Sequence, residues 1–134
     1  ESKAEAWMAL YAKAEEGVQT VLKAQAAQAE AAKIIESGDA SAELKAQAEA
    51  VNQLSADFIK SMLATGRTLV QIISEPTRPM SKLVTLHNIM EHSEGPPNQP
   101  WLQVYEKTAA EIDARIAEFN LALASEVEKL EALN

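Results

Sequence analysis

The feature that most constrains the fold is a regular spacing of apolar residues between residues 100 and 133. These residues follow one another in steps of three or four, which places them on one side of an α-helix. The set consists of Tyr105, Ala109, Ile112, Ile116, Phe119, Leu123, Val127, Leu130 and Leu133. At 1.5 Å per residue such a helix is about 50 Å long, so its apolar side needs partner helices of similar length.

A first long helix is expected at the start of the chain. Ser2 and Glu5 have the spacing of a capping box, and Ser37-Gly38 supplies a helix stop. The side of this helix that we expect to face inward contains Trp7, Leu10, Tyr11, Ala14, Val18, Val21, Leu22, Gln25, Ala29, Ala32 and Ile35. Its alanine-rich middle, residues 24–32, predicts a close approach by a neighbouring helix.

A second and a third helix follow. Asp39 or Ser41 caps a helix that we expect to reach residue 73, and the short connection makes the first two helices an antiparallel hairpin. Pro76 and Pro79 interrupt helical structure over residues 74–79. A short third helix then ends near residue 93. Residues 95–99 contain a proline pair, which predicts a packed, extended strap that runs toward the Gly38 end.

These patterns predict an all-α fold, an antiparallel up-and-down four-helix bundle with three long helices and a short third helix plus a Pro-rich strap. The 134 residues form a single helical bundle domain, residues 1–134, which is long enough to bury its own core. Because the sequence begins with Glu1, we expect this domain to be excised or processed from a longer parent.

Charge and composition exclude several functions. A net charge of -8 disfavours nucleic acid and anionic membrane surfaces, since both recruit clustered Lys and Arg. Having no cysteine excludes disulfides, thiolate nucleophiles and zinc-finger sites. No apolar run has the length of a membrane span, so we expect no membrane insertion.

No residue set predicts a catalytic, cofactor or metal site. His87 and Glu91 share a helical side, but His92 diverges from them, so we expect a partly buried His87 and a solvated Glu91 and His92. The acidic residues of the last helix are expected on its solvated side. They are Glu111, Asp113, Glu126, Glu128 and Glu131.

Two segments carry a family resemblance. Residues 82–90, Lys-Leu-Val-Thr-Leu-His-Asn-Ile-Met, and residues 94–116, which begin Glu-Gly-Pro-Pro-Asn-Gln-Pro-Trp, resemble the helical C-terminal region of bacterial exported proteins built on a sortilin-type β-propeller. Those proteins are often labelled glycosyl hydrolases. The resemblance implies a periplasmic or extracellular location and a β-rich parent that holds any activity; it implies no catalytic residue here.

The expected function is that of a non-catalytic structural or protein-interaction module whose partner is the β-rich remainder of the parent. Trp7 and Trp101 are the expected anchors, because indole rings are favoured at interfaces. One alternative is a ligand-sensing four-helix bundle of the chemoreceptor type. Another is an accessory domain of a protein labelled glycosyl hydrolase. A small hydrolase would need an acidic cleft that the pattern does not predict.

Overall fold

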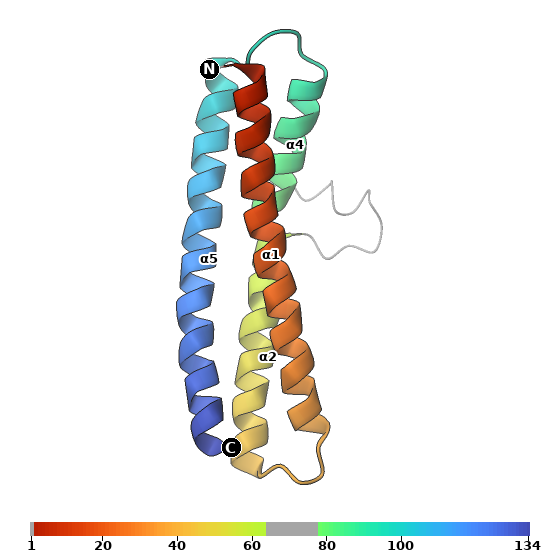
Figure 1. Ribbon diagram of the computed structural model, residues 1–134, viewed down its shortest axis with the longest axis vertical. Coiled ribbons are helices and arrows are strands. Elements are labelled where there is room, and N and C mark those ends of the chain that lie inside the picture. The colour runs from red at the N-terminus through yellow and green to blue at the C-terminus, as the bar shows by residue number, and fades with distance from the viewer. Residues whose placement is uncertain (1, 64–77) are drawn as a thin grey trace.

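The computed structural model describes residues 2–63 and 78–134. Within these ranges the chain forms four α-helices and no strand: α1 spans Lys3–Glu36, α2 Ala42–Met62, α4 Pro79–Glu91 and α5 Gln99–Leu133. The helices pack together (Figure 1), so the expected all-α helical bundle is confirmed.

The helices are arranged in three columns. α1 and α5 each run the length of the bundle, whereas α2 and α4 follow one another along the third column and point in the same direction (Figure 1). α2 has 21 residues and α4 has 13, so together they match the 34 residues of α1. Met62 at the end of α2 and Met80 at the start of α4 both lie next to Gly17, in the middle of α1.

The three-column arrangement differs from the expected four-helix arrangement, because α2 ends at Met62 and the apolar pattern predicted a helix that reaches residue 73. Helical geometry ends at Met62, and Leu63 has the extended dihedrals φ -142° and ψ 155°. The remainder of the expected helix, residues 64–73, lies outside the described residues. As α2 covers only part of the bundle, α4 packs beyond its end and not in a fourth position beside it.

The expected strap between α4 and α5 is wrong. α4 ends at the same end of the bundle at which α5 begins, so residues 92–98 only cross that end and do not travel toward Gly38 (Figure 1). Pro96 is exposed and Pro97 is half-buried. Gly95 has φ +80°, a left-handed conformation that glycine adopts without a steric penalty and that reverses the chain here.

The ends of the helices follow the local sequence. Ser2 Oγ accepts a hydrogen bond from the Glu5 amide at 3.1 Å, and Glu5 Oε1 accepts one from the Ser2 amide at 3.3 Å, which confirms the capping box. The Glu5 carboxylate also accepts from the Ser2 hydroxyl at 2.9 Å, and this bond, together with the one from the Ser2 amide, lowers the pKa of the Glu5 carboxyl. Ser41 caps α2 through the Leu44 amide at 3.1 Å. Asn98 caps α5 through the Trp101 amide at 2.9 Å.

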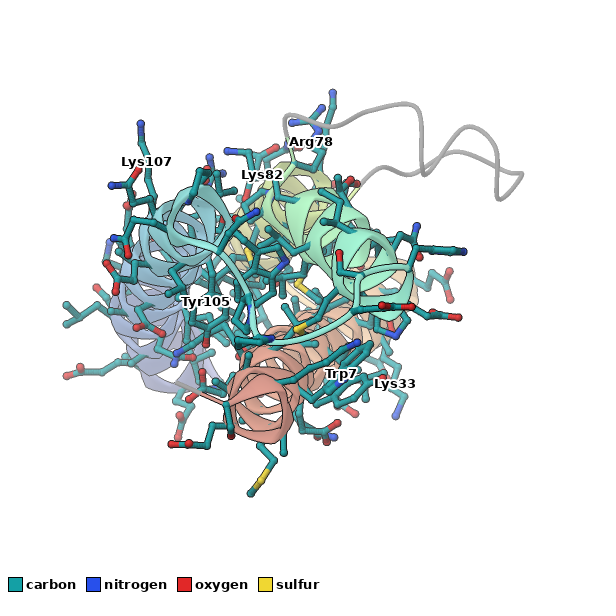
Figure 2. All side chains as sticks on the ribbon, turned by 90° about the horizontal axis from the view of Figure 1, so that it is seen from above. Trp7, Lys33, Arg78, Lys82, Tyr105 and Lys107 are labelled. Atoms are coloured by element: carbon teal, nitrogen blue, oxygen red, sulfur yellow. The ribbon has the colours of Figure 1, made fainter. Side chains whose placement is uncertain are left out.

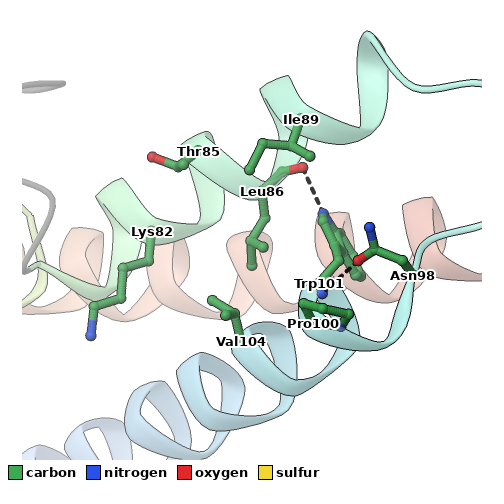
Figure 3. Close-up of a pocket in the computed structure, with 8 residues that line it drawn as sticks. All are labelled: Lys82, Thr85, Leu86, Ile89, Asn98, Pro100, Trp101 and Val104. Carbon is green, nitrogen blue, oxygen red and sulfur yellow. Dashed lines mark hydrogen bonds between the residues drawn. The ribbon is translucent and has the colours of Figure 1, made fainter.

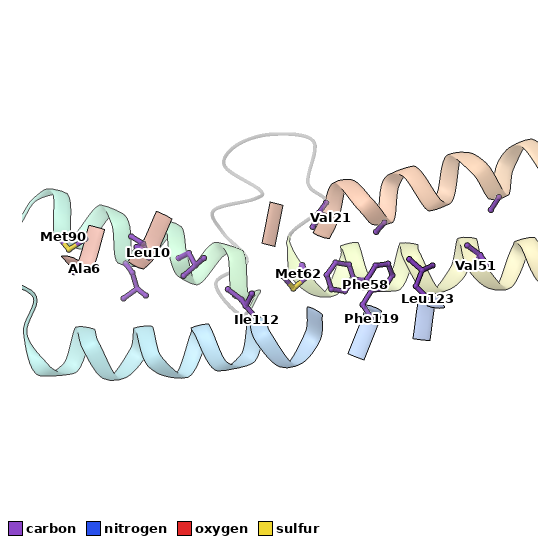
Figure 4. Close-up of a cluster of buried hydrophobic side chains, with 14 of the residues drawn as sticks. Ala6, Leu10, Val21, Val51, Phe58, Met62, Met90, Ile112, Phe119 and Leu123 are labelled. Atoms are coloured by element: carbon purple, nitrogen blue, oxygen red, sulfur yellow. The ribbon is translucent and has the colours of Figure 1, made fainter. Parts of the chain in front are cut away.

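The core has two kinds of packing along its length. α1 and α2 approach through small side chains that are almost fully buried, Ala24 and Ala31 on α1 and Ala48 on α2. Phe58 and Phe119 stack between α2 and α5 with ring centroids 4.3 Å apart (Figure 4). The alanine-rich approach predicted from residues 24–32 is therefore confirmed.

A polar network joins α5 to the third column at the point where α2 ends and α4 begins. Glu111 on α5 accepts from Lys82 Nζ at 3.1 Å and, through its other oxygen, from Arg115 at 2.9 Å. Arg115 also donates to the Ser61 carbonyl at 3.2 Å, in the last turn of α2. Partial burial raises the pKa of Glu111, but the bonds from Lys82 and Arg115 outweigh this effect and lower the pKa below its ordinary value.

Replacing Glu111 by Gln should lower the free energy of unfolding by about 1 to 2 kcal/mol at pH 7, since hydrogen bonds to charged groups contribute most when partly buried. The folded-state pKa of Glu111 is depressed, so its contribution is present above the unfolded pKa and is lost as the pH falls through the folded pKa. Urea denaturation should show that the difference in free energy of unfolding between wild type and variant becomes smaller from pH 7 to pH 3. Glu118→Gln, at an exposed position of α5, is the control. Equal effects of both variants would contradict this role.

Ser55 offers a second test, because its Oγ is fully buried and has no hydrogen-bond partner. A buried hydroxyl without a partner costs free energy that an isosteric apolar group avoids. Ser55→Ala should therefore stabilise the protein by about 1 kcal/mol, seen as a higher urea midpoint at unchanged slope. Ser55→Val should not, because the α1–α2 approach leaves little room for a larger side chain. A lower midpoint for Ser55→Ala would refute the assignment.

Candidate functional site at the tryptophan end of the bundle

Most aromatic residues lie at one end of the bundle. We call this the tryptophan end; it comprises the N-terminal half of α1, α4 and the first turns of α5. It contains four of the aromatic residues and both histidines. These are Trp7, Tyr11, Trp101, Tyr105, His87 and His92. The other half of the bundle contains the Phe58–Phe119 pair.

Trp101 is an internal anchor, so its expected role as an exposed interaction residue is wrong. Its side chain is only 5% exposed, and its indole Nε1 donates to the Leu86 carbonyl of α4 at 2.9 Å. Its ring stacks on Tyr105 with centroids 5.7 Å apart. The indole thus joins α4 to α5 from within the fold.

Trp7 lies at the surface in a cluster with Tyr11 and His87. Its ring stacks on Tyr11 at 5.5 Å and meets the edge of His87 at 4.8 Å. Trp7 is half-buried and lies at the edge of the bundle between α1 and α4 in the view from above (Figure 2). It therefore keeps the accessible surface that an interaction anchor requires.

Tyr11, His87 and Glu91 form a short polar chain beside Trp7. Tyr11 Oη lies 3.0 Å from His87 Nε2, and Glu91 Oε2 lies 3.5 Å from His87 Nδ1. A hydroxyl, an imidazole and a carboxylate in this order can relay a proton. The outer members are open to solvent, however, since Tyr11 is 55% exposed and the Glu91 side chain 57%. Such a chain orients His87, and it does not enclose a reacting group.

The residues with metal-ligand chemistry do not converge. His92 Nδ1 lies 2.9 Å from the Asn88 carbonyl of its own helix, away from His87. Within residues 2–63 and 78–134 no three His, Cys, Asp or Glu side chains form a group that could hold a metal ion. The partly buried His87 and exposed Glu91 match their predicted surroundings.

Two acidic residues differ from their predicted solvated positions. Glu111 is half-buried in the polar network at the end of α2. Glu126 is also half-buried and accepts from Gln47 Nε2 at 2.6 Å, and this bond lowers the pKa of the Glu126 carboxyl. Both carboxylates are committed to contacts between helices, which explains why they leave the solvated side.

An apolar stripe on α1 is exposed, although its residues were expected to face inward. The α1 stripe consists of Trp7, Tyr11, Val18 and Leu22, on one side of the helix. Tyr11, Val18 and Leu22 are 55%, 43% and 50% exposed. His87 of α4 contacts the stripe at Trp7 and Tyr11, whereas Val18 and Leu22 lie further along α1 and stay exposed.

A groove between α4 and α5 is the other candidate surface, and it encloses about 420 Å³ (Figure 3). Buried Leu86 and Trp101 form its floor. Ile89 and Val104 form its walls and are 51% and 48% exposed. Val104 lies outside the apolar side of α5, three residues after Trp101, and this extra apolar position is the sequence signal that indicates the groove.

The two ends of this α4–α5 groove are polar. Lys82 lies at the end nearer the middle of the bundle, and Asn98 lies at the tryptophan end (Figure 3). Pocket linings that are mostly apolar with a few placed polar groups are typical of small-molecule sites. The groove can therefore hold an apolar body and orient a polar group.

Comparison with protein-family models, curated proteins and solved structures finds no match to this chain. The resemblance to sortilin-type propeller proteins therefore stays a hypothesis. None of the helices within the described ranges combines the length and apolar character needed to cross a membrane.

The two tryptophans should respond differently to replacement by phenylalanine. Trp101→Phe removes the hydrogen bond to the Leu86 carbonyl and part of a buried ring, so it should lower the free energy of unfolding by about 1 to 2 kcal/mol. Trp7→Phe, the matched control at a half-buried position, should cost less than about 1 kcal/mol. Urea denaturation measures both, and a larger cost for Trp7→Phe would reverse the two assignments.

Proposed function

We propose that this domain is a non-catalytic structural and protein-interaction module, and that the α1 stripe docks on the β-rich remainder of a longer exported protein. The observation that carries the proposal is the stripe itself. It places four large apolar or aromatic side chains on one side of a helix over about 22 Å. Contiguous apolar surface of this kind favours association with another protein.

Trp7 is the proposed anchor of this contact. Its ring is held by Tyr11 and His87, so little side-chain freedom is lost when a partner covers it. Large rigid aromatic side chains dominate the free energy of many interfaces. The β-rich partner and the periplasmic or extracellular location rest on the sortilin-type resemblance. If the parent carries a glycosyl hydrolase label, this domain is its accessory part.

The exposure of the polar groups beside Trp7 disfavours catalysis. A transition state is stabilised by preorganised donors in a site from which water is excluded. The only polar chain with a suitable order of groups among the described contacts, Tyr11–His87–Glu91, lies open to solvent. The isolated domain should therefore show no glycosidase or esterase turnover.

The docking proposal is tested by calorimetry with the domain and the upstream region of the parent expressed separately. Leu22→Asp places a charge in the α1 stripe and should weaken binding at least tenfold. Leu121→Asp is the matched control, because Leu121 is 76% exposed on α5, outside the stripe. Trp7→Ala should weaken binding by a similar factor. Equal weakening by Leu22→Asp and Leu121→Asp, or no association of the wild-type domain, would refute the proposal.

A ligand-sensing bundle of the chemoreceptor type is the second candidate, and the α4–α5 groove is the observation that favours it. A membrane-spanning segment on each side of this domain in the full gene would support that function. A long β-rich region upstream would support the docking module.

A further inference from the structure

We propose that the α4–α5 groove binds a small amphiphilic carboxylate, a molecule with a medium-length apolar tail and one anionic headgroup. The inference goes beyond the docking function, because it concerns a different surface and different residues. It starts from the shape of the groove. Its volume of about 420 Å³ lies within the usual range for small-molecule sites.

The apolar part of the groove defines the tail. Leu86 and Trp101 close the bottom, and Ile89 and Val104 stand on either side (Figure 3). From Lys82 to Ile89 the α4 wall rises by about 10 Å, which sets the length of tail that stays covered. Trp101 is fixed by its bond to the Leu86 carbonyl, so the floor is formed before any ligand enters.

The charges near the groove define the headgroup. Val104, Lys107 and Glu111 follow one another on α5 in helical steps of three and four, so Lys107 lies on the groove side. Lys82 lies at the groove end, and Figure 2 shows Lys82 and Lys107 on the same side of the bundle. Lys82, Arg115 and Lys107 together carry more positive charge than the single carboxylate of Glu111 that Lys82 and Arg115 share, although the whole chain has a net charge of -8.

Glu111 is the carboxylate that pairs with Lys82, and its two oxygens are already in use. One oxygen accepts from Lys82 and the other from Arg115. Lys82 has three N–H donors, and one of them is directed to Glu111. An incoming carboxylate can thus share Lys82 without displacing Glu111, and Lys107 adds attraction. A cationic headgroup would meet repulsion at the same place.

The first test titrates the whole domain, labelled with ¹⁵N, with octanoate, decanoate and dodecanoate below their aggregation limits. Chemical-shift changes should centre on Ile89, Trp101 and Val104. Each added methylene should tighten binding two- to fourfold, as expected for partly buried apolar groups, until the tail exceeds the groove. Decanoate should bind at least fivefold more tightly than decanol or decyltrimethylammonium. Absence of binding at millimolar ligand, or equal binding of the cationic amphiphile, would overturn the proposal.

The second test compares two matched variants on α4. Ile89→Asp places a carboxylate in the groove wall and should weaken decanoate binding at least tenfold. Val84→Asp introduces the same change at a position of similar exposure, 42% against 51%, that does not line the groove. It should leave binding within twofold. Circular dichroism checks that both variants fold, and equal weakening by both would overturn the proposed location.

Discussion

The polar network around Glu111 is the contact on which the three-column arrangement depends. It lies where α2 stops and α4 starts, and there the third column has two helix termini in place of a continuous backbone. Arg115 satisfies the Ser61 carbonyl of the final α2 turn, while Lys82 ties the first turns of α4 to the same carboxylate. Helix termini leave carbonyls and amides without intrahelical partners, so a junction inside a bundle needs such donors. α5 supplies the donor, Arg115, because this helix runs without interruption past the point where α2 ends and α4 begins.

The apolar side of the same junction depends on Gly17. A Cβ atom there would lie 2.5 Å from Met80 Sδ, so a larger residue at this position would force the Met80 side chain to shift. With polar contacts on the α5 side and a methionine–glycine contact on the α1 side, α4 is held at a fixed height. That position of α4 determines the contact between Trp7 and His87 and the shape of the α4–α5 groove.

The sequence predicts the local features of this fold well. The capping residues Ser2 and Ser41 act within three residues of their partners, so short motifs were sufficient to predict them. The end of α2 at Met62 was not predicted from the sequence. The residues that contact this end, Arg115 at the Ser61 carbonyl and Met80 beside Gly17, are distant from it in sequence. The exposure of the α1 stripe follows from that same long-range event. Trp101 lies four residues before Tyr105 on the apolar side of α5, so its burial was contained in the pattern; the general preference of tryptophan for interfaces led to the wrong role.

The parallel course of α1 and α5 has a consequence for the order of assembly. Contacts between these helices join residues that are far apart in sequence, such as Lys13 and Asp113, separated by 100 positions. The α1–α2 hairpin, in contrast, closes across the few residues between Glu36 and Ala42. Loop closure costs more entropy as the intervening chain lengthens, and distant contacts slow folding. The hairpin is thus the natural nucleus, and α5 docks onto it late, bringing Arg115, which secures the end of α2.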